Sequence, residues 1–144
     1  MNNFIKLYLL SSLSLSFINA DTTKFGLGSC LDQDYPQPIW KAIEKEDLDY
    51  FVFLGDNVYG DLPSGSLRKM VSDYNKQKNN FPEWMKNVEI LPIWDDHDYG
   101  LNDAGSEYPL KRQSQEIYLN FWGIPLDDDR HNRDGIYFSE EKII

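Results

Sequence analysis

Residues 50–57 have the sequence YFVFLGDN, and this stretch indicates the class of fold. Its first five residues form an unbroken apolar run that is rich in aromatic and β-branched side chains. Such a run is typical of a strand that is buried on both faces, as in a parallel sheet. Gly55, Asp56 and Asn57 follow at once, and residues of these types favour a turn. We therefore expect a central strand with polar side chains at its carboxyl end.

The segments on either side of this strand alternate between strand-like and helix-like patterns. A short strand-like run covers residues 24–29, and a second buried strand is expected over residues 90–94. One helix is expected from about Pro38, since proline is tolerated in a first turn. Two more are expected over residues 67–78 and 110–121, where apolar residues fall on one helical face. This alternation predicts an α/β domain, in which ligands bind at the carboxyl ends of the strands.

The last part of the sequence has a different pattern. Residues 135–139 and 142–144 look like two strands of a hairpin. The chain stops on two isoleucines within the second of these runs, whereas domain ends are usually polar. We therefore expect the chain to be a fragment of a longer domain.

The composition limits the class of partner. The chain has 144 residues, which fits one domain, and its 14 basic and 24 acidic residues give a net charge of −10. This balance argues against a nucleic-acid-binding surface or an anionic membrane surface. An acidic chain suits a cation, although many secreted proteins are simply acidic. Cys30 is the one cysteine of the sequence, which excludes an intrachain disulfide.

Residues 1–20 have the pattern of a secretory signal peptide. One lysine precedes an apolar and serine-rich region that is shorter than a typical transmembrane helix. Cleavage is expected after Ala20. We expect residues 21–144 to be exported to the periplasm or the extracellular space without a stable membrane anchor. An uncleaved anchor is one alternative. A lipoprotein cleavage box ending at Cys30 is another, disfavoured because polar residues 21–24 separate it from the apolar region.

The sequence WDDHDYG at residues 94–100 directly follows the strand expected over residues 90–94. Asp95, Asp96 and Asp98 flank His97, and three neighbouring carboxylates repel one another unless a cation, protons or water offset the charge. The alternative is an exposed acidic turn in which a neighbour satisfies the histidine. The position after a buried strand favours a metal site.

Two other loops occupy the same kind of position. Asp56 follows the central strand, and Asn57, Tyr59 and Asp61 add oxygen atoms that suit hard cations. A simple turn built from glycine, aspartate and asparagine explains the same residues. Cys30 follows the first strand-like run and is either a thiolate ligand or a small core residue.

Four motifs together resemble the PhoD-like metallophosphatase (alkaline phosphatase D) family, and specifically the N-terminal part of its catalytic domain. They are FGLGSC at residues 25–30, PIWKAI at 38–43, FVFLGDNVYGD at 51–61 and IWDDHDYGLND at 93–103. The resemblance implies a calcineurin-like α/β/β/α sandwich, of which this chain would hold the N-terminal half. It also implies an exported phosphomonoesterase or phosphodiesterase that hydrolyses its substrate with metal-activated water, at a centre of Fe³⁺ and Ca²⁺.

The resemblance also implies roles for particular residues. Its metal ligands would be Cys30, Asp56, Tyr59 and Asp96. His97 would be the catalytic residue that meets the phosphate or the leaving oxygen. Four more residues would lie around the ligands or against the substrate, namely Asn57, Asp95, Asp98 and Asn102. Other divalent metals remain compatible with this ligand set, because aspartate, cysteine and tyrosine accept more than one ion.

The resemblance has one departure that opens an alternative function. The family's later histidine and acidic ligands would lie beyond residue 144, and His97 and His131 are the two histidines of this sequence. The alternative is a non-catalytic, truncated remnant that at most binds a divalent metal. A glycosidase with paired carboxylates is a third option, which explains neither Cys30 nor Tyr59. The sequence does not decide whether the substrate is a monoester, a diester or a phospholipid. It does not decide the oligomeric state either.

Overall fold

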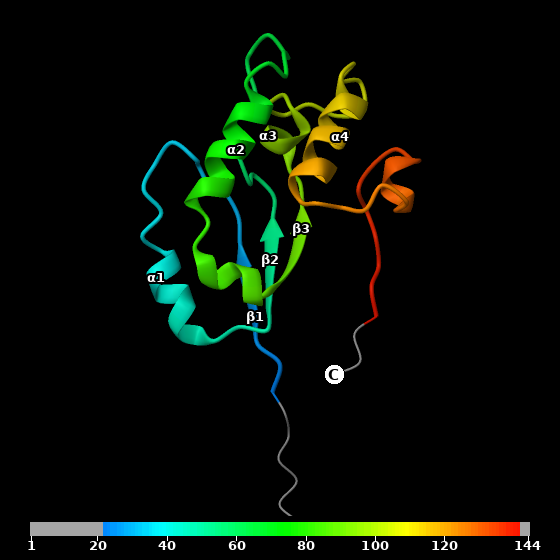
Figure 1. The fold of residues 1–144 in the computed structure, drawn as a ribbon. Helices are drawn as coiled ribbons and strands as arrows, with labels where there is room; N and C mark the ends of the chain where they lie inside the picture. Colours follow the sequence, from blue (N-terminus) through cyan, green and yellow to red (C-terminus); the bar gives the residue numbers. More distant parts are fainter. Residues whose placement is uncertain (1–21, 142–144) are drawn as a thin grey trace, which may run out of the picture.

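A computed structural model of the protein describes residues 22–141. The expected signal peptide, residues 1–20, and the expected strand over residues 142–144 lie outside this described part. The fold is α/β, with a parallel sheet of three strands in the order β1-β2-β3 (Figure 1). The strands are β1 Phe25–Gly28, β2 Tyr50–Leu54 and β3 Glu89–Ile93. The predictions of these three strands are confirmed to within one residue at each end.

Within the described residues, four α-helices connect and extend the sheet. They are α1 Trp40–Ile43, α2 Met70–Asn80, α3 Asp96–Tyr99 and α4 Lys111–Phe121. Three short 3₁₀ helices cover Glu44–Glu46, Glu83–Asn87 and Asp129–His131. Helix α2 begins three residues later than its periodicity predicts, because Leu67 belongs to a turn in which its carbonyl accepts a hydrogen bond from the Met70 N–H.

One face of the sheet forms the first core. Phe51 and Phe53 point to this face and pack edge-on against Trp40 of α1, with ring centroids 5.6 and 6.3 Å apart. Trp122, at the end of α4, lies 5.0 Å from Phe53 on the same side. Complete burial of one such side chain contributes roughly 1.5–3 kcal/mol to stability. This aromatic cluster therefore fixes α1 and the end of α4 against the central strand.

The opposite face of the sheet is largely open, which corrects the expectation of a strand buried on both faces. Leu54 of β2 is 49% exposed, and on the neighbouring strand Phe25 and Leu27 are 49% and 66% exposed. The unbroken apolar run in β2 is therefore compatible with a sheet whose second face carries no layer from residues 22–141. Figure 1 shows α1 and α2 gathered on the other side of the strands.

A second core lies between the strand ends and the helices α2 and α4. Its buried members are Val58, Met70, Tyr74, Tyr118, Leu119 and Ile136. Residues 135–139 contribute Ile136 to this core but form no strand, so the predicted strand over these residues is wrong. Side chains of α4 take the place of a partner strand. The Gly135 N–H donates to Gln115 Oε1, and Gln115 Nε2 donates to the Arg133 carbonyl.

Candidate metal centre

The three strands end at one edge of the sheet, and the loops that follow β1 and β2 are bonded to each other. The Cys30 N–H donates to the Gly55 carbonyl at 3.2 Å, and the Leu31 N–H donates to the Asp56 carbonyl at 2.8 Å. Cys30 and Asp56 both have left-handed backbone angles, with φ of 59° and 52°. This conformation is uncommon for residues other than glycine and concentrates at functional sites.

The loop after β3 continues directly into the short helix α3. Asp95 is its N-cap residue, and its carboxylate accepts from the Asp98 backbone while the Asp98 carboxylate accepts from the Asp95 backbone. Gly55 makes the approach of this loop to β2 possible. A Cβ atom at Gly55 would lie 2.5 Å from Asp95 Cβ, and its φ of 101° is also unfavourable for other residues.

Asp98 is fully buried and connects three elements. Its carboxylate accepts from the backbone N–H and Nδ2 of Asn57, from the backbone N–H of Asp95 and from the hydroxyl of Tyr74 on α2. Burial raises the pKa of Asp98 to about 7, against the opposing effect of these hydrogen bonds. Asp98 and Asn57 therefore hold the strand-end loops in register.

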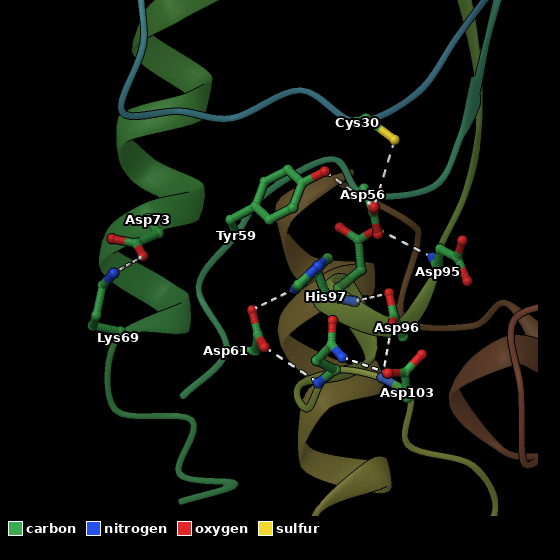
Figure 2. A network of polar contacts seen from close by, with 12 residues as sticks. Cys30, Asp56, Tyr59, Asp61, Lys69, Asp73, Asp95, Asp96, His97 and Asp103 are labelled. Atoms are coloured by element: carbon green, nitrogen blue, oxygen red, sulfur yellow. Dashed lines mark hydrogen bonds and ion pairs between the residues drawn. The ribbon is translucent and has the colours of Figure 1, made fainter. Parts of the chain in front are cut away.

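Asp56, Asp96 and His97 form the candidate cation group (Figure 2). Each offers one ligand atom, and these atoms all lie within 4.8 Å of one another. Asp56 is 9% exposed, and its Oδ1 is buried without a hydrogen-bond partner among residues 22–141. A buried carboxylate oxygen without a donor is costly unless a cation binds it. The donor set of two carboxylates and an imidazole fits a divalent cation.

Cys30 and Tyr59 contact the same aspartate, and the Tyr59 ring lies 4.3 Å from the His97 ring. Cys30 Sγ lies 3.6 Å from Asp56 Oδ2, and the Tyr59 hydroxyl donates to that oxygen at 3.1 Å. Burial, the hydrogen bond with Cys30 and the charge of Asp56 raise the pKa of Tyr59, so the phenol keeps its proton in the metal-free protein. A thiolate and a phenolate suit a trivalent ion such as Fe³⁺, so the residues present fit the expected second cation.

Hydrogen bonds hold the other two members of the group in place. Asp96 accepts from the N–H groups of Asp103 and His97, at 2.6 and 2.9 Å. Burial works to raise the pKa of Asp96, yet these N–H groups and the charge of His97 lower it overall. His97 Nδ1 lies 2.7 Å from Asp61 Oδ1. Burial alone would lower the pKa of His97. The pKa is nevertheless raised overall, because Asp61 accepts a hydrogen bond and because the charges of Asp61, Asp56 and Asp96 favour the protonated ring.

The structure thus brings together the five residues to which the sequence assigned ligand or catalytic roles, namely Cys30, Asp56, Tyr59, Asp96 and His97. The other four expected residues have different contacts. Asp95 caps α3, Asn57 and Asp98 bond to each other, and Asn102 Nδ2 donates to the Asp103 carboxylate at 2.6 Å.

Asp61, Tyr74 and Asp103 support the group through hydrogen bonds. The sequence pointed to Asp61 as an added oxygen donor, because it lies five residues after Asp56 in the same polar loop. No signal in the sequence points to Tyr74. It lies on the apolar face of an amphipathic helix, and only the fold shows that its hydroxyl donates to the Asp98 carboxylate.

Within residues 22–141, no helix combines the length and the apolar character needed to cross a membrane. Comparisons with protein-family models, with curated proteins and with solved structures found no match for this chain.

Proposed function

We propose that this chain carries the metal centre of an exported phosphoester hydrolase that acts on phosphomonoesters or phosphodiesters. One observation carries the proposal: Asp56, Asp96 and His97 converge within 4.8 Å at the carboxyl ends of parallel strands, around a buried Asp56 oxygen that has no donor among the described residues 22–141. Ligand sites of open α/β sheets lie at this edge. The four motifs that resemble the PhoD-like family supply the reaction class.

The ligand sets favour two cations that share Asp56. Asp96 and His97 offer ligand atoms within 4.8 Å of Asp56, and Cys30 and Tyr59 contact Asp56 Oδ2. The oxygen and nitrogen donors of the first pair suit Ca²⁺ or another divalent ion, whereas the thiol and phenol of the second pair suit Fe³⁺. When bound, such cations neutralise the charge of a phosphoryl group and lower the pKa of a water molecule.

The residues of the chain contribute orientation and proton transfer. Asp98 and Asn57 fix the distance between the two loops, so that the ligands need little rearrangement. His97 remains the candidate for contact with the phosphate or the leaving oxygen. Its place within the group also makes it a third cation ligand, and a His97→Gln variant separates these roles. Loss of cation affinity indicates a ligand, and loss of turnover alone indicates a proton donor.

The open face of the sheet supports the finer part of the fold proposal. Phe25, Leu27 and Leu54 expose an apolar surface opposite the helices. Parallel sheets are normally covered on both faces. A second sheet packed on this surface would complete the α/β/β/α sandwich that the resemblance implies.

The test combines cation binding with turnover. The full chain is purified, its metal content is measured, and Mn²⁺ and Ca²⁺ are titrated by calorimetry. Hydrolysis of p-nitrophenyl phosphate and bis-p-nitrophenyl phosphate is followed in parallel. Asp56→Asn should abolish both binding and hydrolysis, whereas Asp127→Asn, the same charge change at an exposed loop position, should affect neither.

Three outcomes of this test decide between the candidates. Cation binding without turnover of either ester favours the non-catalytic alternative, in which the chain holds a metal but performs no hydrolysis. Absence of binding by the unaltered chain, or full activity of Asp56→Asn, overturns the proposal. Comparison of the two esters also separates monoesterase from diesterase activity.

A further inference from the structure

Asp61 makes two contacts that join separate parts of the metal centre. Its Oδ1 lies 2.7 Å from His97 Nδ1, and its Oδ2 accepts from the backbone N–H of Asn102 at 3.2 Å. The histidine is 36 residues away in the sequence and the asparagine 41. One carboxylate therefore ties the loop after β2 both to helix α3 and to the loop that follows it.

Packing fixes the position of Asp61 itself. The preceding Gly60 lies so close to α2 that a Cβ atom there would be 3.0 Å from both Cα and Sδ of Met70. Val58, three residues earlier, is fully buried in the second core. The Asp61 and His97 side chains are themselves only 13% and 21% exposed. The backbone that carries Asp61 is thus held by the packing of its own loop.

We propose that Asp61 is a positioning residue that keeps a proton on His97 Nδ1 and thereby presents Nε2 to the cation group of Asp56 and Asp96. An ionised carboxylate can only accept hydrogen bonds, so the nitrogen beside it must be the donor. The neutral ring then carries its lone pair on Nε2, as a metal ligand requires. Figure 2 shows the imidazole between Asp61 and Asp56. The use of Nε2 at the cation rests on the proposed function, whereas the tautomer does not.

The second histidine of the chain offers a matched comparison. His131 Nδ1 lies 2.9 Å from Glu116 Oε2, which resembles the Asp61–His97 pair. Its Nε2, however, lies 3.3 Å from the Ile124 carbonyl, so both of its nitrogens face protein acceptors. His131 is therefore bonded on both sides as part of the α4 packing. For His97, by contrast, Nδ1 is the nitrogen beside Asp61, and the ring belongs to the same group as the candidate ligands Asp56 and Asp96.

The first experiment measures the tautomer in metal-free protein. The full chain is labelled with ¹⁵N-histidine, treated with chelator and examined by long-range ¹H–¹⁵N correlation at a pH where the imidazoles are neutral. With two histidines in the sequence, two sets of signals are expected. His97 should carry its proton on Nδ1. Asp61→Ala should move it to a mixture of tautomers, and Asp61→Asn, whose amide oxygen still accepts, should restore the Nδ1–H form.

Glu116→Gln is the control and should leave the His97 signals unchanged. The His131 signals report whether each Asp61 variant is folded. A proton on Nε2 of His97 in the unaltered chain, or an unchanged His97 tautomer in folded Asp61→Ala, overturns the assignment. If Asp61→Ala does not fold, the tautomer of the unaltered chain and of Asp61→Asn decides the question.

The second experiment titrates Mn²⁺ into the same proteins. Loss of a carboxylate that orients a metal-binding histidine typically weakens affinity by about 10- to 100-fold. We expect this loss for Asp61→Ala, a smaller one for Asp61→Asn and none for Glu116→Gln. Undiminished affinity of Asp61→Ala overturns the positioning role at the cation. If the unaltered chain binds no Mn²⁺, the proposed function fails, while the tautomer measurement still decides the role of Asp61 towards His97.

Discussion

The buried Asp98 carboxylate binds Asn57 twice, since Oδ2 lies 3.0 Å from both the backbone nitrogen and Nδ2 of Asn57. These residues are 41 positions apart in the sequence. The contact joins the turn after β2 to the helix after β3. The distance between Asp56 and Asp96 therefore depends on an acid that is not itself a member of the cation group.

Replacement of Asp98 should show how much stability this connection contributes. Asp98→Ala leaves the buried donors of Asn57, Asp95 and Tyr74 without their acceptor. Each unpaired buried donor costs roughly 1–3 kcal/mol, so we expect the free energy of unfolding to fall by about 3 kcal/mol or more. Asp98→Asn keeps one acceptor oxygen and should lose less. Urea unfolding followed by tryptophan fluorescence measures both, and an alanine variant as stable as the unaltered chain would contradict the role.

The same residue should make stability depend on pH. The pKa of Asp98 is raised to about 7 in the folded protein, whereas an unfolded aspartate has a pKa of about 3.9. Between these values the folded state binds more protons than the unfolded state, so metal-free stability should fall as the pH rises from about 4 to 7. Asp98→Asn, which does not titrate, should lack this part of the slope. Urea midpoints at several pH values compare the two proteins.

Gly55 should be intolerant of any side chain. In Gly55→Ala the new Cβ would lie 2.5 Å from Asp95 Cβ and 2.8 Å from the Asp95 nitrogen, on a backbone with a φ of 101°. The control is Gly123→Ala, where φ is 67° and a new Cβ would meet no atom of the described residues within 4 Å beyond its own chain neighbours. The free energy of unfolding of Gly123→Ala should fall by about 1–2 kcal/mol from backbone strain alone. If the free energy of unfolding of Gly55→Ala falls by no more than that, the close approach of the two loops is not required.

Substitutions on the two faces of the sheet should have very different effects on the free energy of unfolding. Phe53→Ala removes a buried ring of the aromatic core and should cost about 3–5 kcal/mol. Leu27→Ala removes a side chain that is 66% exposed on the opposite face and should change stability by about 1 kcal/mol or less. Chemical denaturation of the two variants checks the difference. A large loss for Leu27→Ala would indicate that another copy or another segment covers this face in solution.

The sheet was predictable because its signal is local. The apolar run of residues 50–54 coincides with β2. Strand β3 begins at Glu89, and the prediction started one residue later because Glu89 is polar. The prediction of a hairpin strand over residues 135–139 failed because the contacts of this segment are not local. Its backbone partners are side chains such as Gln115, some twenty residues earlier, and the alternation of apolar residues holds no information about such contacts.

The candidate site was predictable where residues directly follow strands. Asp56 and Asp96 come after β2 and β3, and parallel strands bring such positions to one edge. Asp98 has the same local setting, but whether it points to the cation or into the core depends on where α2 places Tyr74. Asp61 likewise gains its role only from the fold, which sets His97 beside it.

Asp56 is the residue whose replacement should separate stability from function. In metal-free protein, Asp56→Asn removes one of the carboxylates that crowd the cation group. The variant should therefore be at least as stable as the unaltered chain without metal. With Mn²⁺ or Ca²⁺ at 100 times the dissociation constant, the unaltered chain should gain about 2.7 kcal/mol, because the cation binds the folded state alone. Asp56→Asn should gain nothing. Thermal unfolding with and without metal provides the comparison, and equal metal-induced shifts in the two proteins would exclude Asp56 as a ligand.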